Sequence, residues 1–381
     1  MHSSNQIQSL AIVTPFYPPH VGGVERYSQE FARAALAMGL SVNIVTTDAV
    51  RKAQESVEDG GIRVLRLPAY NLPMMGSHYP ITLQAWSHAS EMLRCDVVIA
   101  QTRFFMTTLM AARIAAGNKA RFFVVDHGAG PLRNSPKALA LASLWYERAV
   151  TARLKRRSVH FLGVSRASVE WLRTFGIRDA TVLPNGIAAP LTMPMRDAAG
   201  FVKPVVFFAG RLLPEKGIAE LVEAIDLLGR EGTNVALRIA GDGPMAGFLE
   251  KHMRSAGFLT YLGRLPHDQI TAELRNASIF VNPSNLPEGF PTVLLEAGAA
   301  ALPVVSTVGG GSADLIREGE TGFVIPVGAA PDIAARIREI LARPAEALRR
   351  GSELFRLVQA QYTWPSIVRD FLRYAEGGAA A

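Results

Sequence analysis

Short β-rich runs alternate with helical stretches along this chain, and the alternation occurs in both halves of the sequence. Strands are expected at residues 10–14, 41–46, 97–100 and 121–125, with a helix at 25–38. The second half predicts strands at 205–209, 235–240, 279–282 and 304–307, and helices at 218–228 and 291–301. Because strands that alternate with helices form parallel sheets covered on both faces, the fold class is α/β.

The length of 381 residues suggests two or three domains at roughly 150 residues each. Residues 188–204, rich in Pro, Ala, Gly and Met without a clear period, are the best linker candidate. We therefore expect two doubly wound domains, 1–190 and 203–362, and an amphipathic helix at 364–376 that opens with Trp364-Pro365. Ligands of such sheets bind at the carboxyl ends of the strands, so we expect chemistry in the cleft between the domains.

The composition excludes several other classes of protein. Apolar residues make up 49% and charged residues 19%, so the chain can bury a core and is not broadly disordered. No uncharged apolar run approaches the ~18 residues that span a bilayer, and residues 1–14 do not resemble a secretory signal. The single cysteine, Cys95, is compatible with a reducing cytoplasm.

The net charge of +7 is concentrated in residues 101–180, which contain 14 Lys and Arg against four Asp and Glu. Nucleic acid is not expected as a partner, because the sequence has no zinc-finger spacing, RNA-binding aromatic signature or basic-region heptad. An anionic membrane surface or an anionic substrate fits at least as well. The basic run 148–157 beside Trp145 suits an interfacial helix, and equally a core-packed helix with a solvated basic end.

Two glycine-containing clusters follow predicted strands and precede helices. Gly22-Gly23 lets backbone N–H groups approach an anion, although a plain turn would have the same sequence. Arg211 and Lys216 lie five residues apart at a helix start, which suits a pyrophosphate clamp, with a solvated surface pair as the alternative. The order Lys216-Gly217 is not that of a Walker A loop.

A pair of carboxylates and one histidine complete the candidate site. Glu288 lies in a loop and Glu296 about one turn into the following helix, so the two can hold hydroxyls at opposite ends of one ligand. A glycosidase pair is conceivable, but the cations nearby favour an anionic leaving group. His127 ends a predicted strand, where a histidine is as often structural as functional.

Other signals argue against alternative chemistries. The run 241–246 fits the loose dinucleotide fingerprint, but no acidic residue ends the next strand, where Leu262 is found instead. The sequence has no HExxH, no Cys/His ligand set and no Asp-x-Asp, so we expect no metal and no cofactor. It has no GxSxG elbow.

With these residues in hand, the chain resembles a retaining glycosyltransferase of family 4, in the glycosyl transferases group 1. The resemblance covers nearly the whole length. The motifs that carry it are Gly22-Gly23 with Glu25, Asp126-His127-Gly128, residues 183–187, Gly210-Arg211, Glu215-Lys216-Gly217, residues 241–244, Leu262-Gly263, Pro283-Ser284, residues 288–291 with Glu296, Gly310-Gly311 and residues 319–322. Each motif is common alone, but the order and spacing of the set are specific. The sequence departs from the usual pattern at Asp126 and Asp314.

The resemblance implies a GT-B fold: two facing Rossmann-like domains, a deep interdomain cleft, and a C-terminal helix that crosses back to the N-terminal domain. It implies that Arg211 and Lys216 hold the donor's pyrophosphate, that Glu288 contacts the donor sugar, and that His127 lies beside this sugar. Gly22 and Gly23 would lie near the phosphates and the acceptor. The remaining donor-binding residues would be Gly241, Leu262, Gly289, Phe290, Pro291, Thr292 and Glu296. Apart from the resemblance, Arg103 is a candidate acceptor contact because it follows a strand end, and Tyr17 is a second candidate.

The implied function is metal-independent transfer of a sugar, with retention, from a UDP- or GDP-sugar to a glycan or lipid-linked acceptor in polysaccharide or glycoconjugate biosynthesis. The alternatives are a non-catalytic sugar-nucleotide-binding protein and a nucleotide-sugar epimerase of the same fold. We expect a cytoplasmic location, with the inner face of the cytoplasmic membrane as a peripheral site. Donor base, donor sugar, acceptor and linkage have no readable code in this sequence.

Overall fold

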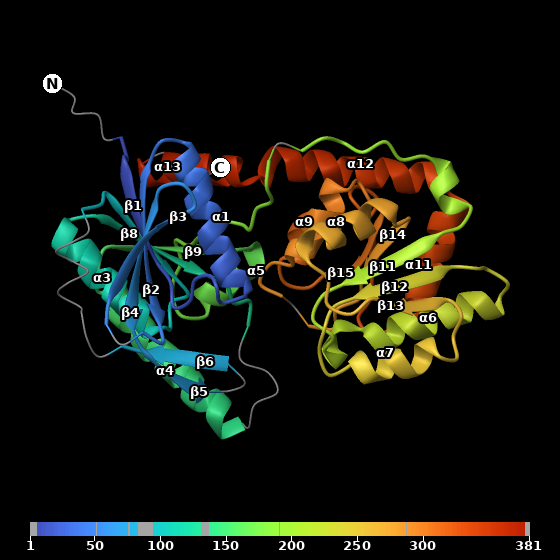
Figure 1. Cartoon of the computed structure of the whole chain (residues 1–381), viewed down its shortest axis with the longest axis horizontal. Coiled ribbons are helices and arrows are strands. Elements are labelled where there is room, and N and C mark those ends of the chain that lie inside the picture. Colours follow the sequence, from blue (N-terminus) through green and yellow to red (C-terminus); the bar gives the residue numbers. More distant parts are fainter. Residues whose placement is uncertain are drawn as a thin grey trace. The chain divides into compact units, whose positions relative to one another are not determined.

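The computed structural model describes residues 6–50, 52–74, 77–82, 94–130, 137–189, 191–286 and 288–377. The chain divides into two compact units (Figure 1). The first unit comprises Met1–Gly186 and Trp364–Ala381, and the second comprises Ile187–Thr363. Each unit is built on its own sheet.

The first unit contains an eight-stranded sheet that is parallel except for one edge strand. Its strand order is β10 (Thr181–Val182), β9 (Val159–Gly163), β8 (Arg121–Asp126), β7 (Val97–Gln101), β1 (Ser9–Val13), β2 (Ser41–Asp48), β4 (Ile62–Pro68) and β3 (Gln54–Glu58). Only β3 pairs in the antiparallel direction among the pairs described for this sheet. A separate hairpin joins β5 (Tyr70–Met74) to β6 (Ser77–Ile81).

Successive strand residues point to opposite faces of this sheet, and helices cover the apolar side chains on both faces. One face, with Val98 and Val124, packs in a common core with residues of α3 (Met106–Asn118), α4 (Lys137–Lys155) and α5 (Arg166–Arg173). On the opposite face, Phe123 contacts Phe371 of α13 (Trp364–Ala375), with ring centroids 5.0 Å apart. The central strands β1, β7 and β8 are therefore nearly continuous runs of buried apolar residues, as the sequence pattern predicts.

The C-terminal helix α13 belongs to the first unit, where it lies beside α1 (Gly23–Ala37) (Figure 1). Phe371 packs edge-on against Phe31 of α1, and Trp364 packs edge-on against Tyr27. The indole of Trp364 also lies against Gly186, where an added Cβ would come within 2.7 Å of the ring. The amphipathic helix expected at the C-terminus thus buries its apolar face on the N-terminal domain.

The second unit contains a six-stranded sheet in which every described pair is parallel. Its order is β13 (Leu259–Tyr261), β12 (Ala236–Ala240), β11 (Val205–Ala209), β14 (Ile279–Asn282), β15 (Val304–Thr307) and β16 (Phe323–Ile325). Counted within the unit, this is the strand order 3-2-1-4-5-6 of a dinucleotide-binding fold, whose order reverses at β11.

The second unit also has helices on both sheet faces. Phe208 and Ile239 share a core with α6 (Ile218–Arg230), α7 (Ala246–Met253) and α11 (Ala330–Ala342). The residues that alternate with these point to the other face of the sheet, where the rings of Phe207 and Phe280 pack with centroids 6.2 Å apart. The other helices are α8 (His267–Asn276), α9 (Thr292–Ala299), α10 (Ser312–Leu315) and α12 (Pro344–Gln361), with 3-10 turns η1 (Ala198–Phe201) and η2 (Pro214–Lys216).

Arg196 anchors the segment that enters the second unit. Its guanidinium donates hydrogen bonds to the carbonyls of Ala300, Ala277 and Leu274 at 2.6–2.7 Å, and to that of Arg275 at 3.3 Å. These carbonyls lie at or just beyond the C-terminal ends of α8 and α9, where helices leave acceptors unpaired. The expected linker 188–204 is therefore fixed to the second unit at this point.

The strands predicted from the sequence are present, and their ends differ from the predicted ones by at most two residues. The helix expected from about residue 291 begins at Thr292, with Pro291 as its N-cap. Within the described ranges, no helix combines the length and the apolarity needed to cross a bilayer.

Candidate functional site

The carboxyl edge of the second unit's sheet brings together the loops that contain most of the predicted donor-binding residues. Arg211 follows β11, Gly241 follows β12, and Glu288 follows β14. Since β11 lies between β12 and β14, these loops meet where the strand order reverses. This is the position at which open parallel sheets bind ligands.

Backbone hydrogen bonds tie these loops to one another. Leu212 N donates to the carbonyl of Asp242 at 2.8 Å, and Asn285 N donates to that of Glu215 at 2.7 Å. Gly241 has a φ of +147°, and a Cβ built on it would lie 1.9 Å from the carbonyl oxygen of Gly210. Only glycine fits this contact, so the loops after β11 and β12 form one continuous backbone surface.

Lys216 and Glu288 form an ion pair at this edge, although 72 residues separate them in the sequence. The lysine side chain is 11% exposed and the glutamate 29%, so a ligand can reach the pair. The backbone of Glu288 is fixed from behind by Gly311, whose N–H donates to its carbonyl at 2.9 Å. Gly310 bridges to the same residue with a φ of +63°, and a Cβ there would lie 1.8 Å from the Glu288 carbonyl.

Arg211 lies on the same β11 loop as Lys216, one residue beyond Gly210. Its side chain is exposed and has no ion pair or hydrogen bond within the described part of the chain. Because no carboxylate among the described residues pairs with it, the guanidinium of Arg211 can bind a phosphate through two hydrogen bonds at this edge of the sheet. Arg211 and Lys216 therefore supply two cations to one surface.

The helix α9 positions the second carboxylate. Glu296 lies one turn after Thr292, and its side chain is 12% exposed. A carboxylate oxygen of Glu296 lies 3.6 Å from Nδ1 of His267, the first residue of α8. Phe290, in the preceding loop, is buried against Tyr362 with ring centroids 5.7 Å apart. The packing of Phe290 fixes the loop that leads from Glu288 into α9.

The other predicted donor-binding positions lie on the same loops. Gly289 precedes Phe290, and its carbonyl oxygen would lie 2.5 Å from a Cβ on Gly311. Leu262 follows β13, where its N–H donates to the carbonyl of Ile239 at 2.9 Å. The structure thus places the second unit's predicted site residues on loops at one edge of the sheet or, for Thr292 and Glu296, in the first half of α9.

In the first unit, Gly22 and Gly23 form the start of α1. Gly22 is the N-cap and Gly23 the first helical residue. A Cβ built on Gly22 would lie 2.2 Å from a carboxylate oxygen of Glu25, so the Glu25 side chain lies over the helix start. A carboxylate is favourable there because the first N–H groups and the helix dipole attract negative charge.

His127 follows β8, next to the reversal of strand order in the first unit's sheet between β1 and β7. Its Nε2 lies 2.7 Å from Oε1 of Gln101, and the ring of Tyr27 packs edge-on at 4.9 Å. Burial lowers the pKa of His127 to about 4, and the nearby Asp126 opposes this shift. The imidazole is therefore neutral at physiological pH.

Arg103 occupies a different position from the one expected for an acceptor contact. Its side chain is 1% exposed and pairs with the carboxylates of both Asp126 and Glu147, while Phe175 lies 4.0 Å below the guanidinium. Burial, together with the charge of Asp126, raises the pKa of Glu147. The prediction of an acceptor contact rests on Arg103 following a strand end, whereas its two carboxylate partners hold the guanidinium in the interior.

Tyr17 also lies in the interior rather than at the surface. The residue is 1% exposed, in the loop between β1 and α1, and burial raises the pKa of its hydroxyl. The guanidinium of Arg66 lies 6.0 Å from its ring and donates to the carbonyl of Pro18 at 2.7 Å. In this structure Tyr17 therefore shapes the loop before Gly22.

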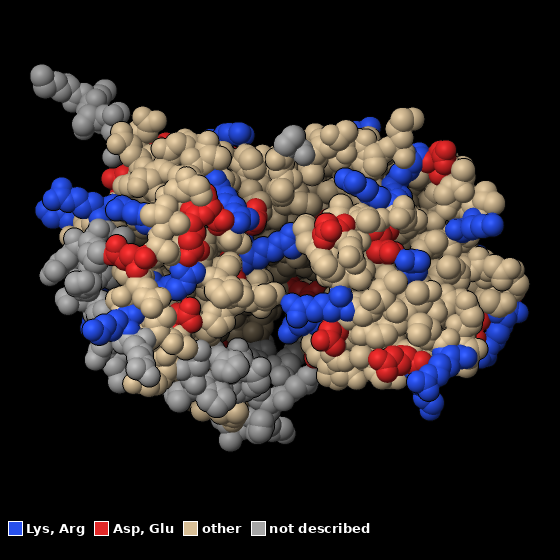
Figure 2. Space-filling model, in the orientation of Figure 1, with Lys and Arg blue, Asp and Glu red and all other residues tan. Residues whose placement is uncertain are grey.

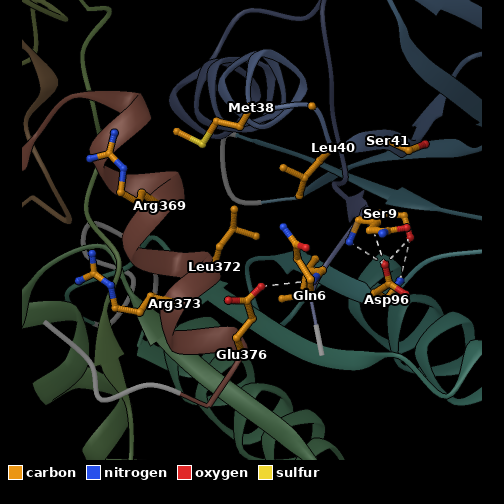
Figure 3. A pocket seen from close by; sticks show the side chains of 13 residues that line it. Gln6, Ser9, Met38, Leu40, Ser41, Asp96, Arg369, Leu372, Arg373 and Glu376 are labelled. Atoms are coloured by element: carbon orange, nitrogen blue, oxygen red, sulfur yellow. Dashed lines mark hydrogen bonds between the residues drawn. The ribbon is translucent and has the colours of Figure 1, made fainter. Parts of the chain in front are cut away.

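A hollow of about 870 Å³ in the first unit lies at the opposite edge of the sheet, near the start of β1 and β2 (Figure 3). Asp96 at its wall accepts hydrogen bonds from the N–H groups of Gln8 and Ser9 and from the Ser9 hydroxyl. Glu376 of the C-terminal segment accepts from Ile7 N at 3.2 Å. These contacts fix the amino end of β1, and the hollow is remote from the carboxyl edge.

Several residues of the site were not predicted from the sequence. Gln101, Glu147 and His267 belong to no motif, and their contacts depend on how strands and helices are brought together. Among the residues that the structure describes, no three His, Cys, Asp or Glu side chains are grouped to hold a metal ion.

Two family models match the chain on either side of the predicted linker. The model described as "Glycosyltransferase Family 4" matches residues 21–189, and "Glycosyl transferases group 1" matches residues 198–353. A glycogen synthase of Mycobacterium tuberculosis is 31% identical over 196 residues, which cover 50% of this chain and 47% of that protein. The chain thus spans about half the length of this relative.

Other similarities extend over nearly the whole chain. A GDP-mannose-dependent alpha-mannosyltransferase of Corynebacterium glutamicum is 27% identical, covering 96% of this chain and 88% of the relative. The structure of a sucrose-phosphate synthase from Thermosynechococcus elongatus superposes with a TM-score of 0.75 at 20% identity, covering 96% of this chain and 98% of the other. The expected fold class is confirmed, and the chain belongs to the group 1 glycosyltransferases of family 4 type, with the GT-B fold.

Proposed function

We propose that this protein transfers a sugar from a UDP- or GDP-sugar to a glycan or lipid-linked acceptor, with retention of anomeric configuration and without a metal ion. The observation that carries the proposal is the Lys216–Glu288 ion pair beside the exposed Arg211. The two cations follow the carboxyl end of a Rossmann-like sheet, a position that suits phosphates, and we assign the carboxylate to a sugar hydroxyl.

The proposed chemistry depends on the departing diphosphate. The bond between the anomeric carbon and the phosphate oxygen breaks, and the acceptor hydroxyl attacks from the same face and loses its proton to a phosphate oxygen. Arg211 and Lys216 would stabilise the charge that develops on the nucleoside diphosphate. Preorganised cations of this kind make a large contribution to catalysis because they need not reorganise during the reaction.

The other site residues would bind the rest of the donor. Glu288, already oriented by Lys216, would accept hydrogen bonds from sugar hydroxyls, and Glu296 would accept them from the ribose. Gly289, Phe290, Pro291 and Thr292 would present the start of α9 to the phosphates, since helix N-termini favour anions. His127, neutral in its partly buried setting, would contact the transferred sugar.

A GDP-sugar is the first donor to test, because the relative that matches nearly the full length is GDP-mannose-dependent. The experiment is thermal unfolding with UDP-, GDP-, ADP- and dTDP-sugars, each with and without EDTA. A ligand at 100 times its dissociation constant adds about 2.7 kcal/mol to stability, which raises the transition by several degrees. We expect one base to give this shift and EDTA to leave it unchanged.

The donor identified in this way is then used in radiolabelled form to assay sugar transfer to a panel of glycan and lipid-linked acceptors. Turnover that requires acceptor supports the transferase. Binding without turnover would identify a sugar-nucleotide-binding protein, and donor conversion without acceptor would identify an epimerase. No shift with any donor would contradict the proposed donor site.

We also propose that α4 docks the protein on the cytoplasmic face of an anionic membrane. Leu141, Trp145 and Arg148 are spaced by three and four residues on this helix and share a face. Leu141 is 59% and Trp145 69% exposed, while Glu147, Val150 and Leu154 are buried. The helix therefore presents apolar groups to solvent next to a basic end, which is the pattern of an interfacial helix.

Nucleic acid is a poorer partner for this charge distribution. On the face drawn in Figure 2, Lys and Arg are interspersed with Asp and Glu over both units. A protein that follows a phosphate backbone needs a continuous basic tract, and this face has none.

A further inference from the structure

The last residue of β7, Gln101, is completely buried and faces the predicted sugar-site histidine. Its Oε1 lies 2.7 Å from Nε2 of His127. Within the described residues, its Nε2 has no hydrogen-bond partner. A buried carboxamide is costly unless its hydrogen bonds are made, so a hydrocarbon side chain would serve a purely structural role better.

The backbone next to Gln101 is strained. Thr102 has a φ of +65°, which is rare for a β-branched residue. The conformation is held by Thr102 N donating to the carbonyl of Val125 at 2.7 Å and by the hydroxyl of Thr108 donating to the Thr102 carbonyl at 2.6 Å. Such strain costs about 1–3 kcal/mol and is concentrated at functional sites.

The strained backbone at Thr102 forms a kink, and the residues on either side of it contact neighbouring residues at the end of β8. Gln101 contacts His127, while Arg103 pairs with Asp126. Asp126 in turn accepts a hydrogen bond from the N–H of Gly128 at 2.9 Å, which fixes the backbone on both sides of the histidine. The end of β7 therefore holds both the histidine's backbone and its ring.

The ring of His127 is constrained from a second direction by the edge-on contact with Tyr27, at an interplanar angle of 86°. An aromatic ring in this position offers no hydrogen bond to the imidazole nitrogens. In the described part of the chain, Gln101 is the hydrogen-bond partner of the ring. In a neutral imidazole one nitrogen donates and the other accepts, and the partner of one nitrogen decides which is which.

We propose that Gln101 is a positioning residue that accepts a hydrogen bond from Nε2–H of His127 and so keeps Nδ1 as an acceptor for a hydroxyl of the transferred sugar. This inference rests on the proposed function, which places His127 beside that sugar. The low pKa of His127 keeps the ring neutral, so that the choice of tautomer matters at physiological pH. The proposed role of Gln101 is to set the ring for the sugar, and it does not touch the nucleotide.

The test replaces Gln101 by Met, which has a similar volume but cannot accept this hydrogen bond. Two-bond ¹H–¹⁵N correlation spectra of histidine-labelled protein report the tautomer of His127, assigned from the spectrum of His127→Gln. We expect a single Nε2–H tautomer in the unsubstituted protein and a mixture of tautomers in Gln101→Met. We also expect kcat/KM for transfer to fall about 10- to 100-fold, while the affinity for the free nucleoside diphosphate stays unchanged.

The matched control is Thr107→Val. Thr107 is fully buried on α3, and its hydroxyl has no partner within the described residues. We expect this isosteric change to leave the tautomer and kcat/KM unchanged. A Gln101→Met protein with an unaltered tautomer, or with kcat/KM within twofold of the unsubstituted protein, would overturn the inference. An unsubstituted protein that transfers no sugar would instead overturn the proposed function.

Gln101→Glu serves as a second variant if the Met variant does not fold. A carboxylate keeps the acceptor for Nε2–H but favours the imidazolium, so both ring nitrogens would become protonated. We expect the spectrum of an imidazolium and a loss of transfer despite the retained hydrogen bond. Normal transfer by a doubly protonated ring would show that Nδ1 is not needed as an acceptor and would contradict the inference.

Discussion

Lys216 and Glu288 meet in an ion pair that closes the loop after β11 against the loop after β14. Because the partners come from strands that are adjacent in the sheet, the pair forms only when the strand order is correct. The carboxylate thus orients the lysine in the absence of ligand. A bound diphosphate would share this lysine with Glu288, and the pair would then connect phosphate binding to sugar binding.

Removing the charge of Lys216 should abolish most transfer while the fold survives. We expect Lys216→Ala to lower kcat by at least about 100-fold, as does the loss of one group that stabilises developing charge. Glu288→Gln should act on the same pair, so the double variant should lose less than the product of the two single effects. Steady-state kinetics of the single and double variants measure this coupling.

Arg230→Ala is the control for this experiment, because Arg230 is 74% exposed at the end of α6 and pairs with Asp226 on the surface. Its kcat should equal that of the unsubstituted protein. Near-normal turnover by Lys216→Ala would contradict the assignment of the donor site.

The fold and the second unit's site residues could be predicted from the sequence because they depend on local signals. Buried strands such as 205–209 and 279–282 have the ends expected from their apolar runs. Loop residues such as Arg211 and Glu288 follow these strands directly, so the parallel topology alone brings them to one edge. The long-range contacts carry no such signal: Gln101 with His127, and Arg103 with Glu147, depend on side-chain directions set by the kink at Thr102.

Replacing Arg103 should destabilise the first unit strongly. Arg103→Met leaves the carboxylates of Asp126 and Glu147 buried without their cation, and breaking such a pair costs about 3–5 kcal/mol. Adding Glu147→Gln to this variant should restore part of the loss, because one buried charge is then removed. Urea unfolding monitored by the fluorescence of Trp171, which lies 5.9 Å from the guanidinium, measures the change.

Arg173→Ala is the matched control on the same unit. Arg173 is 52% exposed and pairs with Glu170 one helical turn away, a surface pair that contributes at most about 1 kcal/mol. Equal losses in Arg103→Met and Arg173→Ala would contradict a structural role for the buried triad.

His127 should make stability depend on pH below neutrality. Its folded pKa of about 4 lies below the ordinary value of 6.5, so the unfolded chain binds more protons between these two values. The contribution of neutral His127 to the free energy of unfolding is therefore fully present above pH 6.5. It falls as the pH decreases toward 4, by no more than about 3 kcal/mol. The free energy of unfolding of His127→Gln, measured over the same range, should fall less steeply; parallel curves for the two proteins would contradict a histidine that stays neutral in the folded state.

The clamp formed by Arg196 should stabilise the ends of two helices. Arg196→Lys keeps the charge, but a single ammonium cannot reach the carbonyls of Ala300, Ala277 and Leu274 together. Each buried carbonyl left without a donor costs about 1–3 kcal/mol. We expect faster hydrogen exchange in the last turns of α8 and α9, whereas Arg338→Lys, at an exposed surface pair, should change nothing there.

Membrane docking by α4 should depend on both its apolar and its basic side chains. Arg148 and Arg153 on this helix and Arg156 just after its end are exposed, and each basic residue near an anionic surface contributes about 1 kcal/mol. Replacing all three by Ser should therefore lower the partition coefficient onto anionic vesicles, measured by sedimentation, by about 100-fold. Raising the salt concentration should also lower the partition coefficient of the unsubstituted protein. Trp145→Ala should weaken binding even in high salt, because its contribution is burial of apolar area.

The control for charge replaces Arg230, Arg317 and Arg356, which are exposed in the second unit, by Ser. This triple variant lowers the net charge by the same amount as the triple variant at α4. If docking depends on α4, this variant sediments like the unsubstituted protein. Sedimentation that falls equally in both triple variants would attribute membrane attraction to net charge alone, because a diffuse attraction does not distinguish which arginines are lost. Sedimentation that is absent at both salt concentrations would contradict docking altogether.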